Sequence, residues 1–416
     1  MRPRLAESWS TSSDGLSVTV RIHPRAKFQD GTPVTGDLVA QALRRALPPL
    51  MGPVFDDVAE IAAPDSSTVR INLRRPSQFI LESLETAIQE PGKAGIGTGA
   101  FIAGKTAGSP TVLTANANYY REPPAIKQIS VTSYPTARAA WADLLRGNLD
   151  MLYEVNIDAL DSLERASNIA VFSFVRRYQY MIVFGPHATA LQSPAVRRAL
   201  SAALDRDAIV RDALNGHGVA SRGPVSTEHW AFPANDHREV AQQNLAKTLA
   251  PMHVKFTCLV PPDAVYQRIA LAVRQQLAAV SVDMEVVEAS QEDVVAAGQS
   301  GNFEALLGDI VSGPTFLRQY RHWYSRTTAI PQPLGSPRID APLDQIRHAK
   351  SDDEYRAGVA AFLHAMDDEP PALFIAWSQA ARAVSRRFEV PAPEFGRDVL
   401  NSIGLWRPAP QAASTN

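Results

Sequence analysis

The chain has 416 residues, which at about 150 residues per domain predicts two or three domains rather than a single core. Hydrophobic residues make up 45% and charged residues 20% of the chain, a globular composition that excludes wholesale disorder. Lys and Arg number 41 against 43 Asp and Glu, and this even balance without a long basic run argues against nucleic acid as the main partner. The single cysteine, Cys258, excludes an internal disulfide framework and a Cys-rich metal site.

The sequence contains no stretch of 18 apolar residues, so no segment is expected to cross a membrane. The N-terminal segment also lacks the apolar core of a secretory signal, because residues 5–15 are polar. Two interpretations follow: the chain is cytoplasmic, or the complete precursor begins further upstream.

Short strands and helices alternate through the first half of the chain. Thr35 is placed to cap a helix that ends at Pro48 and Pro49, and Gly147 is placed to end the third helix. The predicted strands are 16–22, 68–73, 101–102, 111–114 and 129–134, and the predicted helices are 35–47, 78–85 and 136–146.

The second half follows a β-α-β-α-β rhythm, which predicts a second α/β lobe. Ser193 and Pro194 supply a cap and a first-turn proline for its first helix. The predicted strands are 180–184, 254–260, 283–287, 305–310 and 373–377, and the predicted helices are 194–204, 207–214, 266–280 and 291–299.

Residues 99–106 match the phosphate-loop pattern G-x-x-x-x-G-K-[ST]. The four middle residues are typical of a strand, and Ala-Gly-Ser-Pro after Thr106 offers no helix N-terminus for a phosphate. We therefore interpret the match as chance. The sequence has neither G-x-S-x-G nor H-E-x-x-H, and Cys258 lies in an apolar strand pattern typical of a buried, inert thiol. We expect no enzyme, no cofactor and no metal site.

Two features could face a ligand. Residues 308–314 follow a predicted strand, and ligands of open α/β sheets bind beyond the carboxyl ends of strands. The alternative is an ordinary strand-to-helix turn in which Asp309 is a cap. The aromatic residues between 316 and 324 recur at helical spacing, so most of them are expected in the core and one or two beside a cavity.

Six phrases, in this order, resemble the extracytoplasmic solute-binding proteins that serve peptide, dipeptide and nickel ABC transporters. They are LAESW at 5–9, FQDGTPVT at 28–35, GTGAF at 97–101, NANYY at 116–120, LLRGNLD at 144–150, and residues 196–210. The resemblance covers about 200 residues and returns at 306–324. These phrases are mostly scaffold, so the sequence does not identify the solute.

The resemblance implies a two-lobed periplasmic-binding-protein-like α/β fold of type II, with hinge strands between the lobes. Lobe I would contain residues 1–180 with a C-terminal return at 377–416, and lobe II residues 181–376. The expected function is delivery of a peptide-like or related polar solute to a membrane-embedded ABC permease, by hinge closure of a periplasmic or otherwise extracytoplasmic monomer. The candidate ligand-binding residues are Asp309, Ser312, Tyr180, Arg268, Tyr320 and Trp230.

The sequence departs from the family in two ways. Family members carry one or two strands before the LAESW phrase, so we expect lobe I to lack a strand, with lower stability and an unpaired edge. Peptide-binding members carry an Asp-Pro pair in the lobe II cleft loop, where Asp meets the α-amine of the ligand. Here the matching residues are Ser312, Gly313 and Pro314. The alternative function is the ligand-sensing domain of a cytoplasmic transcriptional regulator, which no basic helix in the chain supports.

We predict that the chain does not bind ATP, because no helix follows the phosphate-loop match. Isothermal titration calorimetry with ATP should show no binding at micromolar concentrations. Micromolar binding that the substitution Lys105→Ala abolishes would contradict this prediction.

Overall fold

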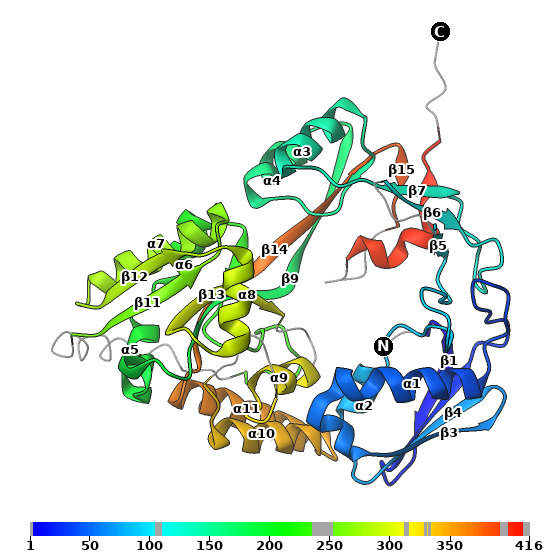
Figure 1. Ribbon diagram of the computed structural model, residues 1–416, viewed down its shortest axis with the longest axis horizontal. Helices are drawn as coiled ribbons and strands as arrows, with labels where there is room; N and C mark the ends of the chain where they lie inside the picture. Colours follow the sequence, from blue (N-terminus) through cyan, green and yellow to red (C-terminus); the bar gives the residue numbers. More distant parts are fainter. Residues whose placement is uncertain are drawn as a thin grey trace.

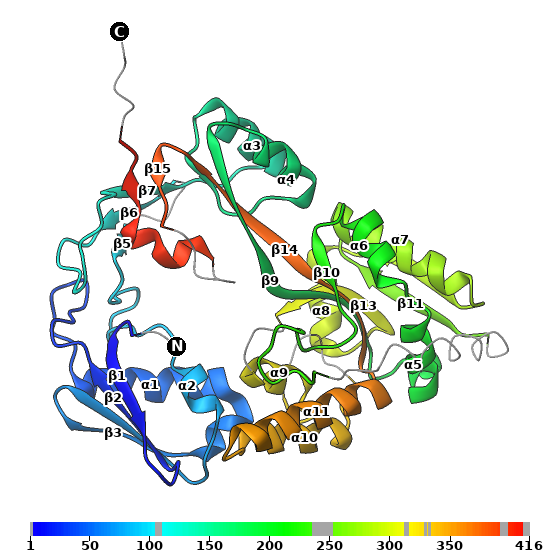
Figure 2. The same cartoon turned by 180° about the vertical axis from the view of Figure 1, so that it is seen from behind.

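The computed structural model describes residues 3–104, 110–234, 253–311, 316–327, 331, 334–391 and 398–410. Its most extended feature is a two-stranded antiparallel ribbon of β9 (Ile169–Phe184) and β14 (Ala372–Ser385). The ribbon runs diagonally through the molecule, with helices α3 (Ala137–Arg146) and α4 (Ile157–Glu164) near one end and helices α5 (Pro194–Ala202) and α6 (Arg206–Ala213) near the other (Figure 1). The view from behind shows the same diagonal course of β9 and β14 (Figure 2).

The N-terminal unit is a four-stranded antiparallel sheet in the order β1-β2-β4-β3, covered by one long helix. Val69 and Ile71 of the sheet are fully buried beneath that helix. The strands predicted at 16–22 and 68–73 are confirmed, whereas β1 and β3 were not predicted. The elements are β1 (Ala6–Thr11), β2 (Ser17–Ile22), α1 (Gly36–Met51), the 3₁₀ helix η1 (Gly52–Asp57), β3 (Val58–Asp65), β4 (Thr68–Leu73) and α2 (Phe79–Ser83).

Helix α1 runs further than its sequence predicts. Thr35 caps it as expected by accepting a hydrogen bond from the backbone N–H of Leu38. The predicted end at Pro48-Pro49 is wrong, because the helix continues through both prolines to Met51. Leu47 and Met51 are fully buried, so packing of this last turn outweighs the missing proline N–H donors.

The next part of the chain forms a three-stranded sheet and two helices at the far end of the ribbon. Gly147 ends α3 in the left-handed conformation (φ 79°), as predicted, and Thr136, predicted as the first residue of this helix, is its N-terminal cap. The elements are β5 (Phe101–Ala103), β6 (Thr111–Ala115), β7 (Gln128–Val131), α3 (Ala137–Arg146), β8 (Met151–Leu152) and α4 (Ile157–Glu164). We call α3, β8, α4 and the ribbon end that packs on them, containing Ile169 and Ala383, the tip unit.

At the other end of the ribbon lies a mixed sheet in the order β10-β14-β9-β13-β11-β12. Strand β11 is parallel to β12 and β13, and β13 is antiparallel to β9. We call β10 to β13 with α5, α6 and α7 the sheet unit; its strands β11 to β13 and its three helices share one core. The elements of this part of the chain are the 3₁₀ helix η2 (Thr189–Leu191), α5 (Pro194–Ala202), α6 (Arg206–Ala213), β10 (Gly218–Ala220), β11 (Lys255–Val260), α7 (Ala264–Ala278), β12 (Asp283–Glu288), α8 (Gln291–Ser300) and β13 (Ala305–Val311).

Strand β9 is much longer than the predicted strand at 180–184, because residues 169–179 pair with residues 377–385 of β14. Cys258 is fully buried in β11, and burial raises the pKa of its thiol to about 12, as expected of an inert thiol. Helices α10 and α11 were not predicted. The remaining elements are α9 (Phe316–Trp323), α10 (Pro337–Arg347), α11 (Asp352–Asp368), β15 (Phe388–Glu389), the 3₁₀ helix η5 (Val399–Leu405) and β16 (Arg407–Pro408).

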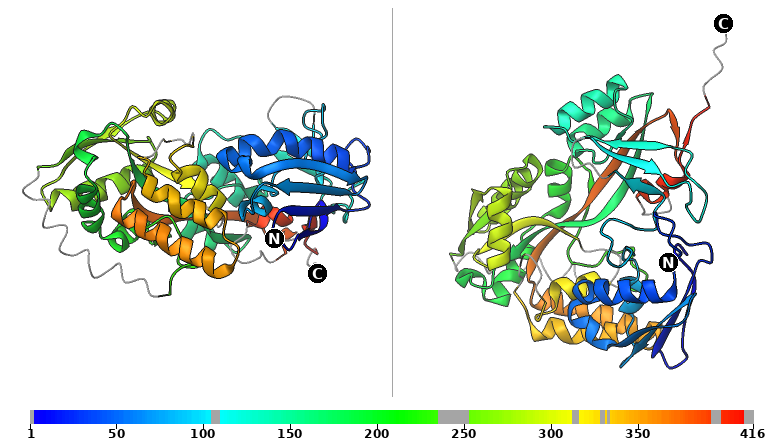
Figure 3. Two further views of the ribbon diagram at one scale, coloured as in Figure 1. Left: turned by 90° about the horizontal axis from the view of Figure 1, so that it is seen from below. Right: turned by 45° about the vertical axis from the view of Figure 1, so that its right-hand side comes forward.

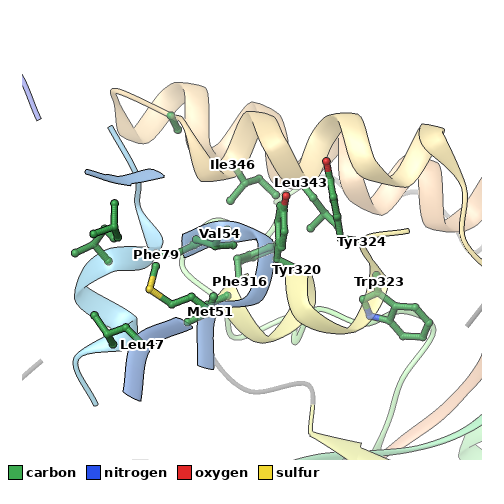
Figure 4. Close-up of a cluster of buried hydrophobic side chains, with 14 of the residues drawn as sticks. Leu47, Met51, Val54, Phe79, Phe316, Tyr320, Trp323, Tyr324, Leu343 and Ile346 are labelled. Atoms are coloured by element: carbon green, nitrogen blue, oxygen red, sulfur yellow. The ribbon is translucent and has the colours of Figure 1, made fainter. Parts of the chain in front are cut away.

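One hydrophobic core joins the N-terminal unit to helices α9–α11, which lie side by side in the views of Figure 3. The rings of Phe79 and Tyr320 meet edge to face at 5.8 Å between centroids. The predicted lobes assign these two residues to different bodies, and the predicted boundary at 180/181 falls inside β9. That division of the chain stays a prediction. Figure 4 shows the core residues Leu47, Met51, Val54 and Phe79 against Phe316, Tyr320, Leu343 and Ile346.

A buried ion pair crosses the same contact. Nε of Arg347 on α10 lies 2.6 Å from Oδ2 of Asp57 at the end of η1, and their side chains are 4% and 0% exposed. Arg347 also donates to the hydroxyl of Tyr320 and to the carbonyl of Pro53. Burial by itself lowers the pKa of Arg347, but its bonds to Asp57 and Tyr320 outweigh burial and raise it, so the guanidinium stays charged.

We predict that Asp57→Asn lowers the free energy of unfolding by about 3–5 kcal/mol, because it removes the buried counter-charge of Arg347 and leaves only the partly exposed Asp344 carboxylate, 3.6 Å away. Urea unfolding followed by tryptophan fluorescence would measure the loss. Asp56→Asn is the matched control, since the Asp56 side chain is exposed. Equal losses in the two variants would contradict the prediction.

Candidate functional site

Two tyrosines and an aspartate meet at the carboxyl end of the parallel strands β11 and β13. Asp309 on β13 lies opposite Tyr180 on β9, and Tyr266 lies in the first turn of α7, which follows β11. The Tyr266 hydroxyl donates a 2.8 Å hydrogen bond to Oδ1 of Asp309. The rings of Tyr180 and Tyr266 pack edge to face at 5.8 Å. This sheet edge is where open α/β sheets bind ligands, and we call the three residues the Tyr-Asp cluster.

The cluster presents a protonated phenol beside a carboxylate. Burial raises the pKa of Tyr266, and the neighbouring Asp309 carboxylate raises it further, so Tyr266 remains a hydrogen-bond donor. Asp309 lies inside a strand that runs to Val311, so the predicted loop at 308–314 begins too early. Asp309 is therefore not at the start of the following helix, α9 (Phe316–Trp323), and its Oδ1 accepts from Tyr266. Ser312 lies outside the described residues.

Arg268 lies on α7 only two residues after Tyr266, but its side chain reaches another element. Its Nη2 lies 2.9 Å from Oδ1 of Asp158 on α4, and its Nε donates to the carbonyl of Ala213 at 2.9 Å. The structure therefore places this predicted ligand residue in a contact between α7 and α4, through its bonds to Asp158 and Ala213.

Two further predicted ligand residues, Tyr320 and Trp230, lie among helices α9–α11. Tyr320 belongs to α9, and Trp230 packs against α11. Tyr320 is fully buried, and its hydroxyl lies 3.1 Å from Oδ1 of Asp344 and 2.8 Å from Nη1 of Arg347. Trp230 is 51% exposed, and its ring stacks on Tyr355 at 5.0 Å, with the Arg356 guanidinium 5.2 Å from its centroid. These contacts hold Trp230 against α11.

The structure thus brings together Tyr180 and Asp309 of the predicted ligand residues, and it adds Tyr266, which sequence reasoning missed. A signal for Tyr266 was present: it is an aromatic residue in the first turn of the helix that follows a strand of the same sheet. Such a position faces the carboxyl end of that sheet.

The phosphate-loop match at 99–106 does not form a phosphate-binding site among the described residues. The phosphate-loop match coincides with β5, the next described residues lead into β6 rather than a helix, and Lys105 lies outside the described residues. Within the described ranges, no group of three or more His, Cys, Asp or Glu residues could hold a metal ion. No helix in that same part of the chain has both the length and the apolar character needed to cross a bilayer.

A surface depression of about 530 Å³ lies between α1, η1 and β3. Two of its lining residues are arginines, and both are engaged by backbone carbonyls: Arg44 by Ile61, and Arg74 by Asp56 and Val58. The depression belongs to the N-terminal unit and contains no residue of the Tyr-Asp cluster.

The sequence is similar to that of known solute-binding proteins. Residues 1–331 match the family described as bacterial extracellular solute-binding proteins, family 5 Middle. The chain is 26% identical over 352 residues to the probable D,D-dipeptide-binding periplasmic protein DdpA of Escherichia coli (strain K12), a match that covers 77% of this chain and 67% of that protein. It is also 26% identical over 316 residues to the glutathione-binding protein GsiB of Shigella flexneri, covering 68% of this chain and 60% of that protein. The matched part is therefore about two thirds of these relatives' length or less.

Solved structures show the same fold. The oligopeptide-binding protein AppA of Bacillus subtilis, in complex with a nonapeptide, superposes with a TM-score of 0.82 at 19% identity, covering 98% of this chain and 90% of that one. AgaA of A. tumefaciens R10, in complex with agropinic acid, superposes with a TM-score of 0.81 at 21% identity. The match covers 99% of this chain and 90% of that one. The predicted two-lobed periplasmic-binding-protein fold is confirmed. Because the family match extends over residues 1–331, the chain belongs to family 5 of the bacterial extracellular solute-binding proteins.

Proposed function

We propose that this chain is a non-catalytic solute-binding protein that delivers a peptide-like or related polar solute to a membrane-embedded ABC permease. The observation that carries the proposal is the family match over residues 1–331. The protein would act outside the cytoplasm, as a monomer, in keeping with the family's description as extracellular. Family membership does not support the alternative of a sensing domain in a cytoplasmic regulator.

The proposed mechanism is hinge closure around the solute. The ribbon joins the tip unit to the sheet unit, and its pairing shifts register between Phe374 and Ala376 and again between Trp377 and Gln379. Such irregularities interrupt the ladder of hydrogen bonds and let strands bend locally. A solute that contacts both units would stabilise the closed form by its differential affinity.

The class of solute follows from the position and partners of Asp309. An α-ammonium held in a drained cavity needs a carboxylate partner, because an unpaired buried charge costs several kcal/mol. The Tyr266 hydroxyl already occupies one oxygen of Asp309, and Asp309 lies within β13 rather than in the loop that follows. Both observations support a solute that has no free amine at this position, such as a blocked peptide or a conjugated amino acid.

We predict that Asp309→Asn weakens solute binding by less than tenfold, because no ammonium is lost from the carboxylate. Calorimetry with matched free and N-acetylated peptides would measure the affinities. Tyr266→Phe is the companion variant, since it removes the phenol and leaves the charge of Asp309. A strong preference for the free amine that disappears in Asp309→Asn would show that Asp309 is the amine anchor.

We also predict that a bound solute reduces the radius of gyration, because closure brings the two units together. Small-angle X-ray scattering of the full chain, with and without a peptide or N-acetylated peptide that raises the melting temperature, would measure the change. An unchanged scattering profile at saturating solute would contradict hinge closure.

A further inference from the structure

A cluster of side chains links α4 to the sheet unit without using the ribbon. Asp158 accepts two contacts from Arg268 of α7, at 2.9 Å and 3.3 Å, and a third from Nδ2 of Asn215 at 3.0 Å. One turn further along α4, Oδ1 of Asp161 lies 3.1 Å from Nε2 of His217. Residues three apart on a helix share a face, so both carboxylates face the same neighbour.

The partners of the two carboxylates are held in place by the sheet unit. Asn215 and His217 lie in the turn between α6 and β10, where Asn215 and Gly216 both have positive φ angles of 54° and 80°. This turn is tied to α7, because Nε of Arg268 donates to the carbonyl of Ala213. The sheet unit therefore offers α4 a preformed set of donors.

Helix α4 belongs mainly to the tip unit. Leu160 and Leu163 pack in the core of that unit with Ile169 at the start of β9, whereas Ile157 at the first position of α4 reaches the core of the sheet unit. The polar cluster thus joins bodies that are otherwise connected by Ile157 and by a ribbon with two register shifts. Side-chain contacts of this kind can break without unfolding either core.

We propose that Asp158 and Asp161, with Arg268, Asn215 and His217, form a latch that sets the angle between the tip unit and the sheet unit in the solute-free protein. The inference rests on the proposed hinge function. It gives Arg268 a role in the contact between the two units in place of the predicted role in binding the solute. The side chains of Arg268 and Asp158 are 33% and 47% exposed, so the pair is partly screened by water. A weak contact suits this role, because the hinge must open and close.

The latch is testable by measuring a distance between the two units. Cys258 is the single cysteine of the chain and is fully buried, so two introduced cysteines can be labelled specifically. Arg138 on α3 and Gln299 on α8 are exposed positions in the tip unit and beside the sheet unit. Single-molecule energy transfer between labels at Arg138→Cys and Gln299→Cys would report the distance distribution in the solute-free full chain.

We predict that Asp158→Asn changes the ratio of the distance populations about two- to fivefold, the effect expected of a partly exposed ion pair. Arg268→Gln should produce the same change, and the double variant no more than either single variant, because both remove one interaction. Asp212→Asn is the matched control: Asp212 pairs with Arg211 on α6 and has no contact with α4 among the described residues.

An unchanged distribution in Asp158→Asn, or additive effects in the double variant, would overturn the latch. Thermal melting of each variant would show that the fold is retained, and Asp161→Asn provides an independent second break. The experiment uses no solute, so its outcome is separate from that of the proposed function. A normal contraction on solute binding with no effect of Asp158→Asn would leave the transport proposal standing and remove the latch alone.

Discussion

The buried pair between Asp57 and Arg347 joins positions 290 apart in the chain, and the packing of the N-terminal unit depends on it. Neither charge can be left alone in the core, because its desolvation cost is offset only by opposite charges and hydrogen bonds; Arg75 and Asp344 are the more exposed second partners of Asp57 and Arg347. The pair therefore fixes η1 against α10, and Phe79 and Tyr320 close the apolar contact beside it. As a result, the start of the chain and helices α9–α11 share one core although the sequence separates them widely.

Two further buried arginines explain why the phrase at 196–210 identifies the family and says little about the solute. Arg197 and Arg206 are 3% and 2% exposed, and their Nε atoms donate to the carbonyls of Pro370 and Phe374, each at 2.7 Å. Burial lowers the pKa of both residues, to about 9 for Arg206. They hold the chain where it enters β14, which positions the ribbon. The phrase thus supplies scaffold contacts to the start of β14.

The distribution of strong and weak contacts suits a protein that must change shape. Buried charges and aromatic rings hold the N-terminal unit to α9–α11, whereas partly exposed polar side chains, Ile157 and an irregular ribbon connect the tip unit to the sheet unit. Helix α7 takes part in both the Tyr-Asp cluster and this connection, because it carries Tyr266 and Arg268.

The sequence alone predicted many of the local elements and the family resemblance, because caps and periodicity act within a few residues. Thr136 and Gly147 bounded α3, alternation marked β2 and β4, and short phrases carried the resemblance. The tertiary structure alone decided which distant side chains meet. Tyr266 and Asp309 are 43 residues apart, and Arg268 and Asp158 are 110 apart. Their contacts depend on sheet register and on how α4 packs, and even the passage of α1 through Pro48 and Pro49 was decided by burial of Leu47 and Met51 rather than by local preference.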